Sequence, residues 1–96
     1  MRDTFSEMVG GMEIMSDGRT VWVNGSDGGL LGRFSRAGID IHHPVAAQVE
    51  TGKQCLNCKP GPTDGTDWTA FRDGMRDIYG AEISDRHTPD FLKVPA

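Results

Sequence analysis

Hydrophobic and polar residues alternate along residues 12–23, and this alternation predicts two strands joined by a tight turn. Asp17 and Gly18 stand between the two stretches, and Asp-Gly is a favoured two-residue hairpin turn. Centred on this dipeptide, the turn pairs Ile14 with Val21. Because side chains in a strand alternate with a period of two, the apolar residues of both strands then share one face.

A second Ser-Asp-Gly sequence at residues 26–28 predicts a second turn and a third strand. Centring this turn pairs Val21 with Phe34 and Trp22 with Arg33. Phe34 joins the apolar face, whereas Trp22 and Arg33 lie on the other face, where the guanidinium can stack on the indole. The two hairpins together predict an antiparallel meander.

The rest of the chain supplies a short strand and two helices. Residues 39–42 alternate apolar and polar, which predicts a fourth strand, and residues 44–51 open with proline and have helical spacing. Residues 67–79 predict the main helix, capped by Thr66. Its apolar positions recur every three or four residues: Trp68, Phe71, Met75, Ile78 and Tyr79. We therefore expect an α+β fold, with a meander of three or four strands, one main C-terminal helix packed on one face and a second short helix.

The chain is short enough to form one domain over residues 1–96. Residues 3–9 predict one or two helical turns, residues 53–66 a loop, and residues 1–10 and 84–96 flexible ends. The hydrophobic fraction is 36%, which predicts a thin core. A metal ion, a protein partner or self-association into a homodimer would add stability to such a core.

Charge and hydropathy narrow the classes of partner. The net charge is −4 and the basic residues are scattered, which disfavours nucleic acid as a direct partner. The sequence has neither an apolar run long enough to cross a membrane nor a secretory signal, so we predict a cytoplasmic protein. Cysteines in that compartment are expected to stay reduced. The acidic balance favours another protein as the partner.

Cys55 and Cys58 form a Cys-x-x-Cys pair that can place two thiolates on one metal ion. His42 and His43 stand at the end of the predicted fourth strand, separated from the cysteines by the short helix. The four residues together predict a zinc site that would stabilise a thin core. Two reduced cysteines without a metal, or a redox dithiol, are the alternatives.

The sequence contains no complete catalytic constellation. Asp40 and His42 share a face of the predicted strand, so the carboxylate could orient the imidazole. No serine in a suitable turn accompanies them as a nucleophile, and a small thiol or hydrolytic enzyme is left as an alternative. We predict that the protein is not an enzyme.

Residues 21–58 contain the segments VWVN, SDG, GRFS, GIDIH and CLNC in that order. This pattern resembles small uncharacterised proteins of bacterial and phage or prophage origin. The resemblance implies a mobile-element origin, and from it an inhibitor of a host defence complex. Our prediction is a small acidic protein-binding or regulatory module without a cofactor, which binds its partner through Trp22 and Arg33. A zinc-stabilised Cys/His module is the alternative.

Overall fold

The computed structural model describes residues 4–93 and has an α+β fold. Six antiparallel strands form one sheet, and their order in the sheet follows their order in the chain. The strands are β1 (Phe5–Val9), β2 (Met12–Ser16), β3 (Val21–Asn24), β4 (Leu30–Ser35), β5 (Gly38–His42) and β6 (Cys55–Pro60). The helices are α1 (Val45–Thr51), α2 (Gly65–Tyr79) and two 3₁₀ turns, η1 (Asp85–His87) and η2 (Asp90–Leu92). The predicted fold class is thus confirmed, but the predicted number of strands is too low.

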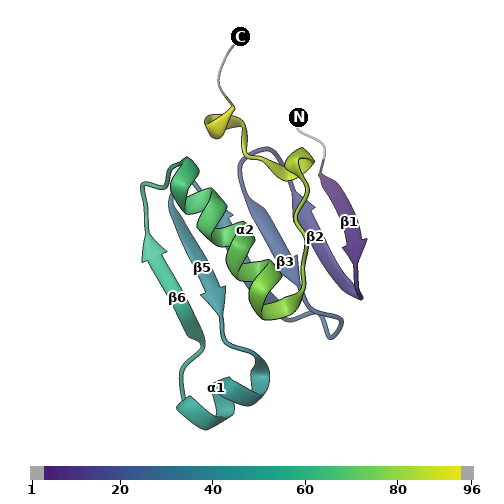
Figure 1. Ribbon diagram of the computed structural model, residues 1–96, viewed down its shortest axis with the longest axis vertical. Helices are drawn as coiled ribbons and strands as arrows, with labels where there is room; N and C mark the ends of the chain where they lie inside the picture. The colour runs from purple at the N-terminus through teal and green to yellow at the C-terminus, as the bar shows by residue number, and fades with distance from the viewer. Residues whose placement is uncertain (1–3, 94–96) are drawn as a thin grey trace.

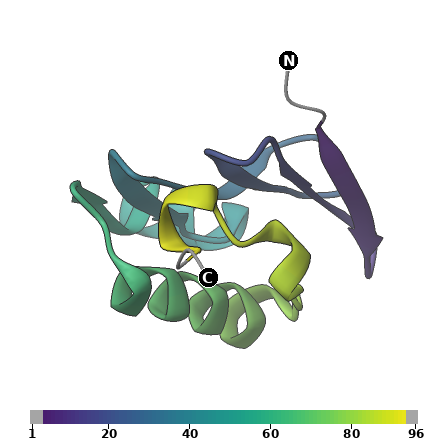
Figure 2. The same cartoon turned by 90° about the horizontal axis from the view of Figure 1, so that it is seen from above.

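The sheet is covered on one side. Figure 2 shows α2 and the C-terminal segment on the same side of the sheet, with no described element over the opposite face. α2 lies across the sheet (Figure 1), and the segment after it returns along the same side to η2. The core lies between these layers and consists of Ile14, Val21, Val23, Phe34, Ile39, Ile41, Trp68, Phe71, Met75, Ala81 and Ile83. We call the other side of the sheet the open face.

The first hairpin has the predicted faces but not the predicted register. Val21 pairs with Ser16 rather than with Ile14, so the predicted pairing is wrong by two residues. The cause is the side chain of Asp17, whose Oδ1 accepts a hydrogen bond from the backbone N–H of Thr20 at 2.8 Å and widens the turn. A shift of two residues preserves the alternation of side chains, which explains why the apolar face was still predicted correctly.

The second hairpin has the predicted register. Val21 pairs with Phe34 and Trp22 with Arg33, as the second Ser-Asp-Gly turn indicates. The predicted strand at residues 39–42 is β5, and it pairs with β4. These strands carry the centre of the apolar face.

The main helix begins earlier than predicted. Asp64, not Thr66, is its N-cap: the Asp64 side chain accepts from the backbone N–H of Asp67, and the Asp67 side chain accepts from the backbone N–H of Asp64. This reciprocal capping box satisfies two backbone donors at the first turn. Gly80 ends the helix in the left-handed conformation, with φ of 70°. The predicted stripe is confirmed at its first three positions, since Trp68, Phe71 and Met75 are buried.

The two edge strands, β1 and β6, correct the sequence analysis. Residues 5–9 form β1 rather than helical turns, because Gly10 and Gly11 both have positive φ and make a tight two-residue turn into β2. Residues 55–60 form β6 rather than part of a loop. The strand is exposed at every position, so it lacks the apolar alternation by which strands are recognised.

Helix α1 confirms the predicted short helix and buries none of its residues. It connects β5 to β6 beyond the end of the sheet (Figure 1). Val45 and Val49 are 62% and 82% exposed. Within residues 4–93, no helix is long and apolar enough to cross a membrane. The predicted flexible ends, 1–10 and 84–96, lie partly outside the described residues, and their described parts include β1, η1 and η2.

Candidate functional site: a Cys/His cluster on the edge strand

His42, Cys55 and Cys58 come together where β5 meets β6. One ligand atom from each residue lies within 4.8 Å of the others. We call these three residues the Cys/His cluster. They include three of the four residues that the sequence predicts as metal ligands.

A β-bulge brings the two cysteines to the same side. In a regular strand, residues three positions apart point to opposite faces. Here Asn57 pairs with Ile41 and Cys55 with His42, so Leu56 is an extra residue in β6. The bulge reverses the alternation at this point and lets Cys55 reach Cys58.

The imidazole of His42 is held in an orientation suited to a ligand. Its Nδ1 lies 2.9 Å from the backbone carbonyl oxygen of Leu30. Because a carbonyl can only accept, Nδ1 carries the proton and Nε2 of the neutral ring keeps its lone pair. A histidine that ligates a metal through one nitrogen commonly donates to a carbonyl through the other. Tyr79 donates to the His42 carbonyl oxygen at 2.8 Å and fixes the backbone at the same residue.

Cys55 and Cys58 are joined by a disulfide bond. The two thiols were expected to stay reduced, and the disulfide corrects that expectation. Both cysteines are exposed, whereas His42 is buried, with 8% of its surface accessible. The cluster therefore has one fixed, buried member and two members in contact with solvent.

His43 lies outside the cluster. Its backbone N–H donates to the carbonyl of Gln54 at 2.8 Å, and its carbonyl accepts from the Gln48 side chain at 2.8 Å. These bonds close the connection through α1. Of the two adjacent histidines, only the one that ends β5 joins the cysteines.

Asp40 does not orient His42 as the sequence analysis proposed. Its carboxylate instead forms an ion pair with Arg33, with 2.7 Å between Nη2 and Oδ2. Arg33 lies in β4, between Trp22 of β3 and Asp40 of β5. Its guanidinium forms an ion pair with Asp40 in place of the predicted stacking on Trp22. The predicted placement of Trp22 and Arg33 on the face away from the core is confirmed by the register.

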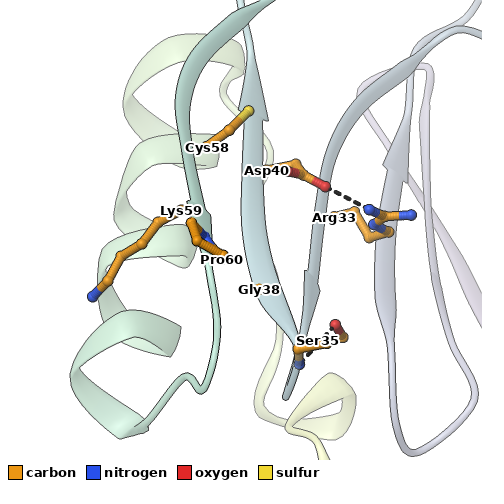
Figure 3. Close-up of a pocket in the computed structure, with 8 residues that line it drawn as sticks. Arg33, Ser35, Gly38, Asp40, Cys58, Lys59 and Pro60 are labelled. Atoms are coloured by element: carbon orange, nitrogen blue, oxygen red, sulfur yellow. Dashed lines mark hydrogen bonds and ion pairs between the residues drawn. The ribbon is translucent and has the colours of Figure 1, made fainter.

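A groove of about 320 Å³ lies beside the cluster on the open face. Cys58 and the Arg33–Asp40 pair line it, as Figure 3 shows with α2 behind the sheet. Asp40 and Cys58 are direct partners across β5 and β6. The exposed residue Cys58 is therefore next to a charged pair on the surface.

The structure also contains a buried polar network that the sequence analysis missed. His87 Nε2 donates to a carboxylate oxygen of Glu7 at 2.9 Å, and Nδ1 accepts from the Ser16 hydroxyl at 2.7 Å. Ser84 donates to the same Glu7 oxygen at 3.1 Å. Burial lowers the pKa of His87, although the Glu7 carboxylate opposes that shift. Because His87 and Ser16 are both buried, we interpret the network as a structural link between η1 and the first two strands.

No protein-family model, curated protein or solved structure matches the chain. The resemblance of residues 21–58 to phage and prophage proteins therefore stays a prediction.

Proposed function

We propose that this protein is a small zinc-binding module in which His42 and the reduced Cys55 and Cys58 hold the ion. The observation that carries the proposal is that a ring nitrogen of His42 and the two sulfurs, which are joined by a disulfide in this structure, lie within 4.8 Å of one another. Thiolate sulfur and imidazole nitrogen are the ligands that structural zinc sites use most. The hydrogen bond from His42 Nδ1 to the Leu30 carbonyl supports the assignment of Nε2 as the third ligand.

The position of the cluster suits a stabilising role. β6 is exposed at all six positions, so burial contributes little to holding it in the sheet. An ion shared by His42 and the two cysteines would tie β6 to β5 at the end where α1 leaves the sheet. Three protein ligands leave a fourth position for water or for a group from a partner.

The first prediction concerns metal content. Protein purified under reducing conditions should contain about one equivalent of zinc by elemental analysis. Cys58→Ser should lose the metal, because a hydroxyl is a much poorer zinc ligand than a thiolate. His43→Gln is the matched control and should keep it, since His43 lies outside the cluster.

Chelation should lower the melting temperature of the wild type and leave that of Cys58→Ser unchanged, because metal binding and folding are linked. Cys58 is exposed, so its replacement removes no core contact. Metal-free wild type, or equal zinc in wild type and Cys58→Ser, would contradict the proposal.

The uncovered face of the sheet supports a second proposal, which is that the protein binds another protein. Trp22 is partly buried there, and the side chain of Arg33 is 51% exposed. Tryptophan and arginine are the residue types most enriched at the energetic centres of protein interfaces.

We predict that Trp22→Ala and Arg33→Ala each abolish capture of the native partner by the immobilised protein, while leaving the melting temperature nearly unchanged. Lys53→Ala is the control, because Lys53 is exposed on the connection between α1 and β6. Capture retained by both open-face variants would remove this face as the binding surface.

A further inference from the structure

The two sulfur atoms assigned to zinc are the same two that form the disulfide between Cys55 and Cys58. Two thiolates on one tetrahedral zinc ion lie roughly 3.8 Å apart, given Zn–S distances of about 2.3 Å. Disulfide sulfurs are directly bonded and carry no thiolate charge. The bonded pair and the metal-bound pair therefore exclude each other, and oxidation leaves only His42 as a ligand.

The backbone of β6 does not require the disulfide. The strand is paired with β5 from Gly38 to His42, and Lys59 forms an ion pair with Asp67 of α2 at 3.2 Å. The Cα atoms of the two cysteines are 5.8 Å apart. Rotation of the two side chains changes the sulfur separation at this fixed backbone distance, so the same strand can present either state.

Both cysteines are accessible to a reagent in solution, since each is exposed at the edge of the sheet. Exposed disulfides are the labile ones in thiol–disulfide exchange, in contrast to buried structural ones. Among the strands of residues 4–93, none pairs with the side of β6 that faces away from β5. A small disulfide can therefore approach the sulfurs of Cys55 and Cys58 from solvent.

We propose that oxidation of Cys55 and Cys58 by a low-molecular-weight disulfide releases the zinc ion, so that the cluster is a redox-controlled metal site. This inference rests on the proposed zinc binding. One thiolate attacks the small disulfide and forms a mixed disulfide, which releases one small thiol. The second thiolate attacks the protein sulfur of the mixed disulfide and releases the second small thiol. Two electrons pass from the cysteines to the small disulfide, and zinc leaves with its charge unchanged.

The experiment follows zinc and thiols together in the full chain. Protein reduced with a phosphine and loaded with zinc is freed of excess reagent and then treated with oxidised glutathione. Released zinc is measured with a chromogenic chelator, and the disulfide by the loss of two mass units. We expect one zinc ion released for each disulfide formed, and rebinding after reduction. Loss of a residue that only hydrogen-bonds to a metal ligand lowers metal affinity by about 10- to 100-fold. Oxidation removes two ligands, so the affinity for zinc should fall by more than about 100-fold.

Each outcome has one meaning. If the reduced protein binds no zinc, the proposed zinc function fails, and this inference fails with it. If the reduced protein binds zinc and keeps it after the disulfide has formed, or if zinc fully prevents oxidation, only the redox control is overturned. His42→Gln provides the control, since it keeps both cysteines: it should form the disulfide at least as readily as the wild type while holding less zinc.

Discussion

At the scale of single residues, His87 is a buried histidine with a hydrogen bond at each ring nitrogen. Its ring lies between Ser16 and Glu7, with a ring-centroid distance of 4.8 Å to Phe5. Burial lowers the pKa of His87 from its usual value of 6.5, and the positive charge of Arg86 also lowers this pKa. The folded protein therefore binds a proton at this site less readily than the unfolded chain.

We expect this difference to appear in the pH dependence of stability. A group whose pKa is lowered by folding contributes its full stability at pH values above its pKa in the unfolded chain, here near 6.5. That contribution is lost as the pH falls through the lower pKa of the folded state. Urea unfolding between pH 7.5 and pH 5 should show this loss, and His87→Gln should reduce the slope. If stability changes equally with pH in both proteins, His87 does not control the pH dependence.

The residues of the candidate site could be predicted in part from the sequence. The spacing of Cys55 and Cys58 marks them as a pair, and His42 follows from the expected strand end. Which of His42 and His43 lies beside the cysteines could not be predicted, because the answer depends on the bulge at Leu56. His87 had no local signal, since its partners Ser16 and Glu7 are 71 and 80 positions away in the chain.

At the scale of elements, the sequence predicts those whose stability comes from an apolar face. β3, β4 and α2 have regular alternation or helical spacing, and each was placed correctly to within a few residues. The edge strands β1 and β6 were not predicted, each for its own reason. β1 has an inward-facing Glu7 that is satisfied only by distant residues, and β6 has no buried position at all. Both are defined by pairing with a neighbour rather than by their own pattern.

At the scale of the whole molecule, one aromatic side chain joins the three parts of the core. Phe34 of β4 is fully buried, and its ring centroid lies 5.0 Å from that of Trp68 and 5.7 Å from that of Phe71 on α2. It also stacks on Phe91 of η2 at 6.2 Å. The sheet, the helix and the C-terminal segment therefore meet at one residue.

Phe34→Ala should destabilise the protein by about 3–5 kcal/mol, because it removes a buried ring and leaves a cavity between all three parts. Met8→Ala provides the comparison, since Met8 is 68% exposed and its loss should change stability by less than about 0.5 kcal/mol. Both values can be measured by urea unfolding. Similar losses in the two variants would contradict the central position of Phe34.

The order of the strands has a consequence for how the chain reaches this structure. Each strand pairs with the next along the chain, so the strand pairings join segments that are neighbours in sequence. Such pairings favour fast folding, although the core closes only when α2 and the C-terminal segment pack on the sheet. The contact between His87 and Glu7 differs from these pairings, because it joins positions 80 residues apart. During synthesis, the carboxylate of Glu7 remains without this partner until residue 87 has been made.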